Sequence, residues 1–241
     1  MRGSLNWIQQ PVNVTGVLAG FVPLAYLVYF IHAFWLNIPR ADSLRSATIA
    51  FKTASGTLTL DDILQSAIGH LTIPSYLMTI ASVHLLDWNL RVELLFNFTI
   101  AVATFGLLMF LVWRTDRQIF PFVLFPASLL FFSVQQNLNW IIVYHGVWFH
   151  VQFLILLAAT LVIFTRNQRN GLIAALVLTV IATFSHGAGA VGWGVLLLAM
   201  LFNGYRYQCR DQPCGIVLRF AIPVKQHCQQ QHTPAYRPGP V

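Results

Sequence analysis

The chain has 241 residues, of which 57% are hydrophobic and 9% are charged. Soluble domains usually carry about 25% charged residues, so this composition excludes a water-soluble fold. The net charge of +7 would suit a nucleic-acid partner, but the basic residues stand in short groups between apolar stretches rather than in one patch. That distribution is typical of loops that set membrane topology, so we expect the lipid bilayer, and no nucleic acid, as the partner.

Long apolar stretches follow one another and predict an all-α, polytopic transmembrane bundle of six or seven spans. The first stretch is too long for a cleavable signal peptide and is expected to remain in the membrane. The stretch 71–86 is ambiguous, because its polar residues suit either a short span or a helix half-buried against the bundle. The predicted spans are Val14–Leu36, Val92–Trp113, Ile119–Val134, Ile141–Thr165, Gly171–Phe184 and Gly189–Phe202.

Two topologies are compatible with these spans. If 71–86 does not cross, the N-terminus is cytoplasmic and the loop 37–70 lies outside. If 71–86 crosses, the N-terminus is outside and the loop is inside, which fits the distribution of Lys and Arg slightly better. Both place the turns at 135–139 and 185–189 outside and the C-terminal tail inside. In either case we expect a multi-pass protein of the inner (plasma) membrane.

The first loop predicts two short helices. Asp42 is suited to cap a helix over Ser43–Ser55, in which Leu44, Ala47 and Phe51 form an apolar stripe. Thr59 or Asp61 is suited to cap a second helix that runs through Ile68. Amphipathic helices between a first span and the rest of a bundle are expected to lie in the membrane interface.

The composition changes after residue 203. We therefore predict a transmembrane domain, 1–203, and a polar tail, 204–241. The tail is either a disordered cytoplasmic segment or the product of a shifted reading frame. Its cysteines, Cys209, Cys214 and Cys228, do not have the spacing of a zinc site, and no cofactor is evident from the sequence.

Candidate chemistry lies in a few polar residues near the predicted outer face. Asp42 follows the first span and is either a base or cation-binding carboxylate, or only a helix cap. His70 ends the first loop, where it is placed to contact a phosphate. His186 lies at a helix break, where free backbone amides suit an anion or a sugar. Gln136, Asn139 and Trp140 combine amides with an aromatic ring, which suits sugar hydroxyls or an ordinary interfacial turn.

Two histidines lie inside a predicted span. Polar groups within membrane helices are often functional, which makes His145 and His150 of interest. Their spacing puts them roughly 140° apart around a helix, so they are a poor pair for chelating one ion. Interhelical hydrogen bonding is the alternative.

Four segments carry a resemblance to a known class: Gly56–Gln65, Asp87–Glu93, the pattern Gln136-x-x-Asn139-Trp140, and Phe184–Gly189. Together with an Asp after the first span and interfacial helices, they resemble the GT-C class of membrane glycosyltransferases and a group of bacterial polytopic proteins related to it. The resemblance extends over about residues 14–203. It implies an outer position for the first loop.

The resemblance implies a transferase that moves a sugar from a polyprenyl phosphate on the outer face, with Asp42 as base or as ligand of a divalent cation. GT-C enzymes are usually much longer, so this chain would be a truncated or inactive relative. The alternative is a non-catalytic subunit of a larger membrane complex that packs through its Phe- and Gly-rich helices. A transporter is the weakest reading, because no repeat between halves is evident.

Overall fold

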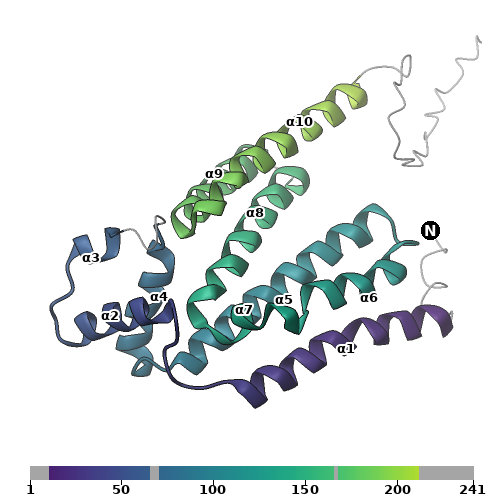
Figure 1. Ribbon diagram of the computed structural model, residues 1–241. Helices are drawn as coiled ribbons and strands as arrows, with labels where there is room; N and C mark the ends of the chain where they lie inside the picture. The colour runs from purple at the N-terminus through teal and green to yellow at the C-terminus, as the bar shows by residue number, and fades with distance from the viewer. Residues whose placement is uncertain (1–10, 66–70, 166–167, 212–241) are drawn as a thin grey trace, which may run out of the picture.

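The computed structural model describes residues 11–65, 71–165 and 168–211, and these residues form helices and no strands. Figure 1 shows long helices packed side by side, with a group of short helices gathered at one end. The α-helices are α1 (Pro11–Phe34), α2 (Ser43–Ala54), α3 (Leu60–Leu64), α4 (Ile73–Leu86), α5 (Leu90–Thr115), α6 (Phe120–Phe131), α7 (Asn137–Ile141), α8 (Val147–Phe164), α9 (Gln168–Ser185) and α10 (Val191–Asp211). Three short 3-10 helices join them, namely η1 (Val134–Gln136), η2 (Val143–Gly146) and η3 (Gly187–Ala190).

Two layers of helices meet at α8. On one side α5 packs against α8, while α1 packs against α6 (Figure 1). On the other side α9 and α10 pack against α8 through small side chains, which let the helix backbones approach closely. The largest buried clusters are Leu27, Ala101, Phe132, Trp140 and Phe149 in the first layer, and Ala158, Val162, Ala175, Leu196 and Ala199 in the second.

Among the described residues, three helical segments are long and apolar enough to cross a membrane: Val14–Phe34, Leu90–Thr115 and Val143–Phe164. In the most apolar part of Leu90–Thr115 only 28% of the residues are buried inside the protein. Apolar side chains left outside the core of a helical chain are expected where lipid replaces water. The protein is therefore membrane-associated, as its composition predicts.

Several predicted bounds differ from the structure. The predicted span Ile119–Val134 contains α6, which has only 12 residues and carries Pro126 inside it. At 1.5 Å per residue α6 is about 18 Å long, less than the hydrocarbon core of about 30 Å. At the other end α10 continues to Asp211, so the first residues of the predicted tail 204–241 are helical. The remainder of that tail, with Cys214 and Cys228, lies outside the described residues.

The ambiguous stretch 71–86 contains α4, which has 14 residues and packs against α2. Tyr76 of α4 and Ile49 of α2 form a buried cluster against Tyr144 of η2. One face of α4 is thus buried against α2 and η2, and both predicted alternatives for 71–86, a short span and a half-buried helix, stay predictions.

The first loop contains the two predicted short helices. The predicted helix Ser43–Ser55 is α2, whose small and polar face packs inward while Leu44 and Phe51 are exposed. An apolar stripe turned away from the protein suits an interfacial helix. The second helix is shorter than predicted, because α3 ends at Leu64 rather than at Ile68. Residue 68 lies outside the described part of the chain.

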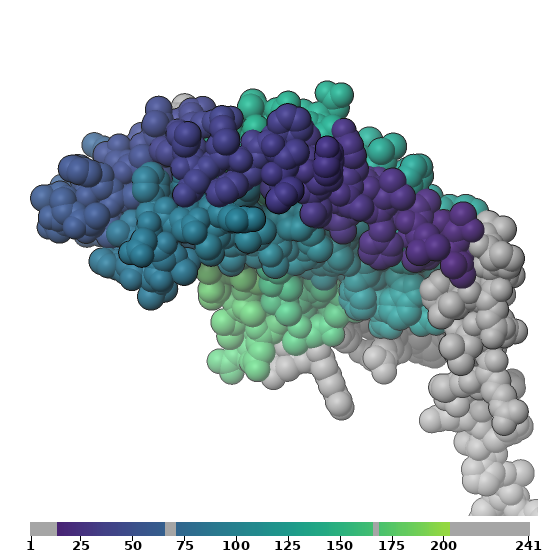
Figure 2. Space-filling model, turned by 90° about the horizontal axis from the view of Figure 1, so that it is seen from below, coloured from purple at the N-terminus to yellow at the C-terminus, as the bar shows by residue number. Residues whose placement is uncertain are grey.

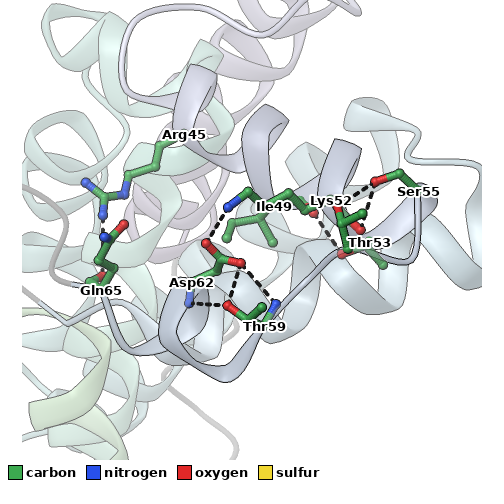
Figure 3. Close-up of polar contacts among 9 residues, drawn as sticks. Arg45, Ile49, Lys52, Thr53, Ser55, Thr59, Asp62 and Gln65 are labelled. Carbon is green, nitrogen blue, oxygen red and sulfur yellow. Dashed lines mark hydrogen bonds and ion pairs between the residues drawn. The ribbon is translucent and has the colours of Figure 1, made fainter.

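A polar network joins α2 to α3 (Figure 3). Thr59 and Asp62 form a capping box, in which each side chain accepts from the backbone amide of the other. The same Asp62 carboxylate forms an ion pair with Lys52 near the end of α2. The hydrogen bond from Lys52, followed by those from the backbone and the hydroxyl of Thr59, lowers the pKa of Asp62 from 3.8 to about 2.

This network predicts a step in local stability at acid pH. A carboxyl whose pKa is lower in the folded chain stabilises the fold above its unfolded pKa and loses this effect as the pH falls toward its folded pKa. We therefore expect the amide protection factors of residues 57–65, which are corrected for the intrinsic exchange rate, to fall between pH 4 and about pH 2. Hydrogen–deuterium exchange should show this step in the wild type and in Asp61→Asn, but not in Asp62→Asn. An equal step in Asp62→Asn would contradict the assignment.

Candidate functional site

The carboxylate of Asp42 lies against a histidine that is distant in the sequence. Oδ2 of Asp42 is 3.2 Å from Nε2 of His145, and the two residues are separated by 103 positions. The Asp42 side chain is 43% exposed and the His145 side chain 20% exposed, so the pair faces outward on the side of the carboxylate. A carboxylate that is held by an imidazole and open to a ligand is an arrangement suited to general base catalysis.

Asp42 occupies the position of a helix cap without acting as one. It directly precedes α2, but its side chain makes no capping hydrogen bond. Thr59 and Asn89 occupy the same position before α3 and α5, and both side chains accept from backbone amides there. The prediction that Asp42 caps α2 is therefore wrong, because its backbone is already helical and its carboxylate is directed to His145.

The residue before Asp42 has an unusual backbone. Ala41 has a φ of 47°, the left-handed region that residues with a Cβ rarely adopt. Such a residue costs about 1–2 kcal/mol. Strain of this kind persists where the surrounding structure imposes it, and it is frequent at functional sites.

The strain at Ala41 gives a stability prediction. Ala41→Gly removes the Cβ and should raise the free energy of unfolding by about 1 kcal/mol. Ala47→Gly, inside α2, is the matched control and should lower that free energy by about 1 kcal/mol, because glycine is a poor helix former. Denaturant titration of the purified proteins in detergent measures both. A loss of stability in Ala41→Gly would show that the left-handed turn is not strained.

Two hydrogen bonds hold η2 in place beneath α2. The backbone amide of Tyr144 donates to the hydroxyl of Ser43 at 3.3 Å. On the opposite side, Nδ2 of Asn97 in α5 donates to the carbonyl of Val143 at 2.8 Å. Gly146 leaves room for Asn97, since a Cβ at Gly146 would be 2.1 Å from the Asn97 amide. The backbone on both sides of His145 is therefore fixed from two elements, which orients its ring.

Some buried polar atoms of α5 and η2 have no partner in the described part of the chain. Oε1 of Glu93, Oδ1 of Asn97 and Nδ1 of His145 are buried and unbonded there. Glu93 and Asn97 are one helical turn apart on α5, and each is 3% exposed. Unpaired buried polar groups cost free energy, so a water or a polar ligand beside each of these atoms is favourable.

The other predicted site residues have different positions. Gln136 and Asn139 hydrogen-bond to each other near η1 and α7, and neither bonds to Asp42 within the described residues. Trp140 is only 1% exposed, stacks on Phe149 at 4.5 Å and donates to the carbonyl of Ser133. Its ring packs in the core in this structure, and no face of it is open to a sugar. His70 lies outside the described residues.

His186 has a local structural role. Its Nδ1 accepts from the amide of Ala188 at the start of η3, and its ring lies 4.1 Å from that of Trp148. The predicted break between two helices is present at this point, since α9 ends at Ser185 and α10 begins at Val191. His186 therefore shapes the break, and an anion or sugar contact there stays a prediction.

The sequence singles out His145 but does not indicate its partner. Its position inside an apolar stretch indicates a functional side chain. Its spacing from His150, however, does not indicate which residue it contacts. The two histidines diverge: His145 faces Asp42, whereas His150 lies edge-on to Phe96 at 5.5 Å. In residues 11–65, 71–165 and 168–211, no three or more His, Cys, Asp or Glu side chains lie close enough together to hold a metal ion.

The fold and site define a class of protein: in the part of the chain that the structure describes, an all-helical bundle has three helices that could cross a membrane and a partly exposed Asp–His pair at one end. Comparisons with models of protein families, with curated proteins and with solved structures found no match.

Proposed function

We propose that the chain is a GT-C-like membrane glycosyltransferase that takes its sugar from a polyprenyl-phosphate donor, with Asp42 as the base. The observation that carries the proposal is the Asp42 carboxylate, which is free of capping bonds, partly exposed and 3.2 Å from His145. The strained backbone at Ala41 supports the same site. The resemblance of residues 14–203 to GT-C proteins supplies the reaction class.

The proposed reaction is a displacement at the anomeric carbon. A bond forms between the acceptor oxygen and that carbon, while the bond from the carbon to the phosphate oxygen breaks. The electron pair of the broken bond leaves on the polyprenyl phosphate. The proton of the acceptor hydroxyl passes to Asp42, and His145 holds the carboxylate in position for the transfer. Alternatively, Asp42 holds a divalent cation that neutralises the leaving phosphate.

We further propose a multi-pass topology in the inner membrane, with six or seven spans. The helices α1, α5 and α8 are the long spans. The apolar segments Arg169–Ser185 and Gly187–Phe202 are shorter, and they add two crossings as a hairpin. The short α6 makes the sixth crossing together with the segment that follows it, and α4 makes the seventh if it crosses. Cysteine accessibility on each side of the membrane tests this topology.

The experiment that tests the activity measures free polyprenyl phosphate. Membranes containing the full chain are incubated with a panel of polyprenyl-monophosphate hexoses, with Mg²⁺ or with a chelator. We expect release of polyprenyl phosphate by the wild type and by Asp61→Asn, whose carboxylate is exposed and outside the pair. Asp42→Asn should release at least about 100-fold less. Activity lost on chelation would favour the cation role for Asp42 over the base role.

The same measurement separates the alternative, a non-catalytic subunit of a larger complex. The exposed apolar residues on α10, which include Leu197, Leu198 and Leu201, suit such packing as well as they suit lipid. In that case the wild type releases no polyprenyl phosphate, and Asp42→Asn leaves co-purification with a partner unchanged.

A further inference from the structure

A groove separates α1 from α5 on the surface of the bundle. It has a volume of about 170 Å³. Its wall is apolar and consists of Val28 and Ile31 from α1 with Leu94, Leu95 and Phe98 from α5. Val28 and Leu95 are each about half exposed, so the groove is open along its side. Figure 2 shows α1 running along the surface of the molecule, with the blue-green residues of α5 beside it.

The groove is cationic at one end. Arg91 and His32 are the charged or titratable residues in its lining. The guanidinium of Arg91 lies 5.4 Å from the centre of the Trp35 ring, and Trp35 also lines the groove. Nε1 of Trp35 is buried and has no partner in the described chain. No carboxylate pairs with Arg91 among the described residues, so this end offers hydrogen-bond donors and positive charge without a counter-ion.

The groove changes from cationic to apolar along the length of α5. Arg91 lies at the start of α5, and Trp35 follows the end of α1, so both are at the boundary of candidate spans. Such boundary positions are where Trp and Arg meet lipid headgroups. From Arg91 to Phe98 the groove follows α5 for two helical turns, about 10 Å, toward the membrane interior. A groove that is cationic at the membrane interface and apolar further inward matches a lipid with its headgroup at the interface and one chain pointing inward.

We propose that this groove binds one anionic phospholipid, with its phosphate at Arg91 and one acyl chain along Val28 and Leu95. The site is separate from the proposed sugar transfer. Its lining contains no carboxylate, amide or hydroxyl side chain that could recognise a sugar, and neither Asp42 nor His145 lines it. The bound lipid fixes α1 against α5 and so fixes the start of the first loop, which carries Asp42.

Lipid retention by the purified full chain tests the proposal. The protein in mild detergent is mixed with dioleoyl phosphatidylglycerol or dioleoyl phosphatidylcholine, and bound lipid is counted by native mass spectrometry. We expect the wild type to retain one phosphatidylglycerol in preference to phosphatidylcholine. Arg91→Gln should bind it about fivefold more weakly, since one basic residue near the interface contributes about that factor.

Two variants control for folding and for charge. Arg117 lies 4.7 Å from the ring of Trp113, which is the same kind of pair at the other end of α5, and Arg117 does not line the groove. Arg117→Gln should therefore retain the lipid as the wild type does. Leu95→Trp fills the groove without changing its charge and should weaken binding as Arg91→Gln does.

Three results would overturn the proposal. The first is equal retention of the two phospholipids by the wild type. The second is an equal loss in Arg117→Gln and Arg91→Gln, which would show an effect of net charge alone. The third is displacement of phosphatidylglycerol by an equimolar polyprenyl monophosphate, which would make the groove a substrate site. Because this assay measures no sugar transfer, a catalytically inactive chain still gives a clear answer.

Discussion

Gly189→Ala should destabilise the protein by about 3 kcal/mol, at the upper end of the usual range for overpacking. A Cβ on Gly189 would lie 1.9 Å from the carbonyl oxygen of Ala182 and 2.3 Å from its carbon. Both atoms belong to the backbone of α9, so no side chain can move aside and the α9–α10 turn must shift. The midpoint of denaturant unfolding in detergent measures the loss.

The matched control for this substitution lies in the same part of the chain. A Cβ on Gly194, in α10, would have no atom within 4 Å. Gly194→Ala should therefore stabilise the helix by about 1 kcal/mol, because alanine is the better helix former. If Gly189→Ala unfolds within about 0.5 kcal/mol of the wild type, the close packing of the turn is not as described. Gly189 is thus used inside the chain, and its substitution cannot be read as evidence for a partner interface.

Asp42→Asn should lower the proposed release of polyprenyl phosphate by about 10²–10⁴-fold, the usual contribution of a general base. Asparagine keeps the shape of the side chain but has no basic oxygen to accept the acceptor proton. The melting temperature should stay within a few degrees of the wild type, because Asp42 makes no capping bond and is partly exposed. Release at the wild-type rate by Asp42→Asn would remove this carboxylate from the mechanism.

His145→Gln tests the partner of Asp42 as a positioning residue. Glutamine can still reach a carboxylate but cannot hold it with an imidazole, so the carboxylate should be displaced. A displacement of about 1 Å can cost up to about 100-fold in rate. We expect this loss in kcat with KM nearly unchanged, and no further loss when His145→Gln is combined with Asp42→Asn. Losses that multiply in the double variant would show that the two residues act independently.

The elements that the sequence predicts well are those with local causes. The helices α1, α2 and α5 follow from apolar periodicity and from turn residues, and their bounds agree with the prediction within a few residues. The predicted span Ile141–Thr165 begins too early, because η2 occupies Val143–Gly146 and α8 begins at Val147. The predicted span Ile119–Val134 is longer than α6, because apolar composition alone does not show where a helix ends before Ser133. Phe132, the residue after α6, packs in the core against Trp140 with the two ring centroids 6.3 Å apart.

The candidate site was only half predictable. Asp42 stands out because an acid directly after a first span is rare in so apolar a chain. Its pairing with His145 depends on a left-handed residue at Ala41 and on η2 being held by Asn97, and neither feature has a local sequence signal. Trp140 shows the opposite case. An aromatic residue beside amides suggests a sugar contact, but its ring is needed in the core where four segments meet.

The position of η2 has a consequence for how the chain is assembled during synthesis. Its Val143 carbonyl is bonded by Asn97, seven residues or about 10 Å along α5 from Leu90, so irregular backbone lies well inside the helical layer. Such backbone cannot face lipid, because each unpaired amide or carbonyl there is costly. Ser43, which receives the Tyr144 amide, is translated 101 residues earlier. Ser43 is therefore already synthesised when η2 leaves the ribosome. The acceptor for the Tyr144 amide is thus present when α8 folds.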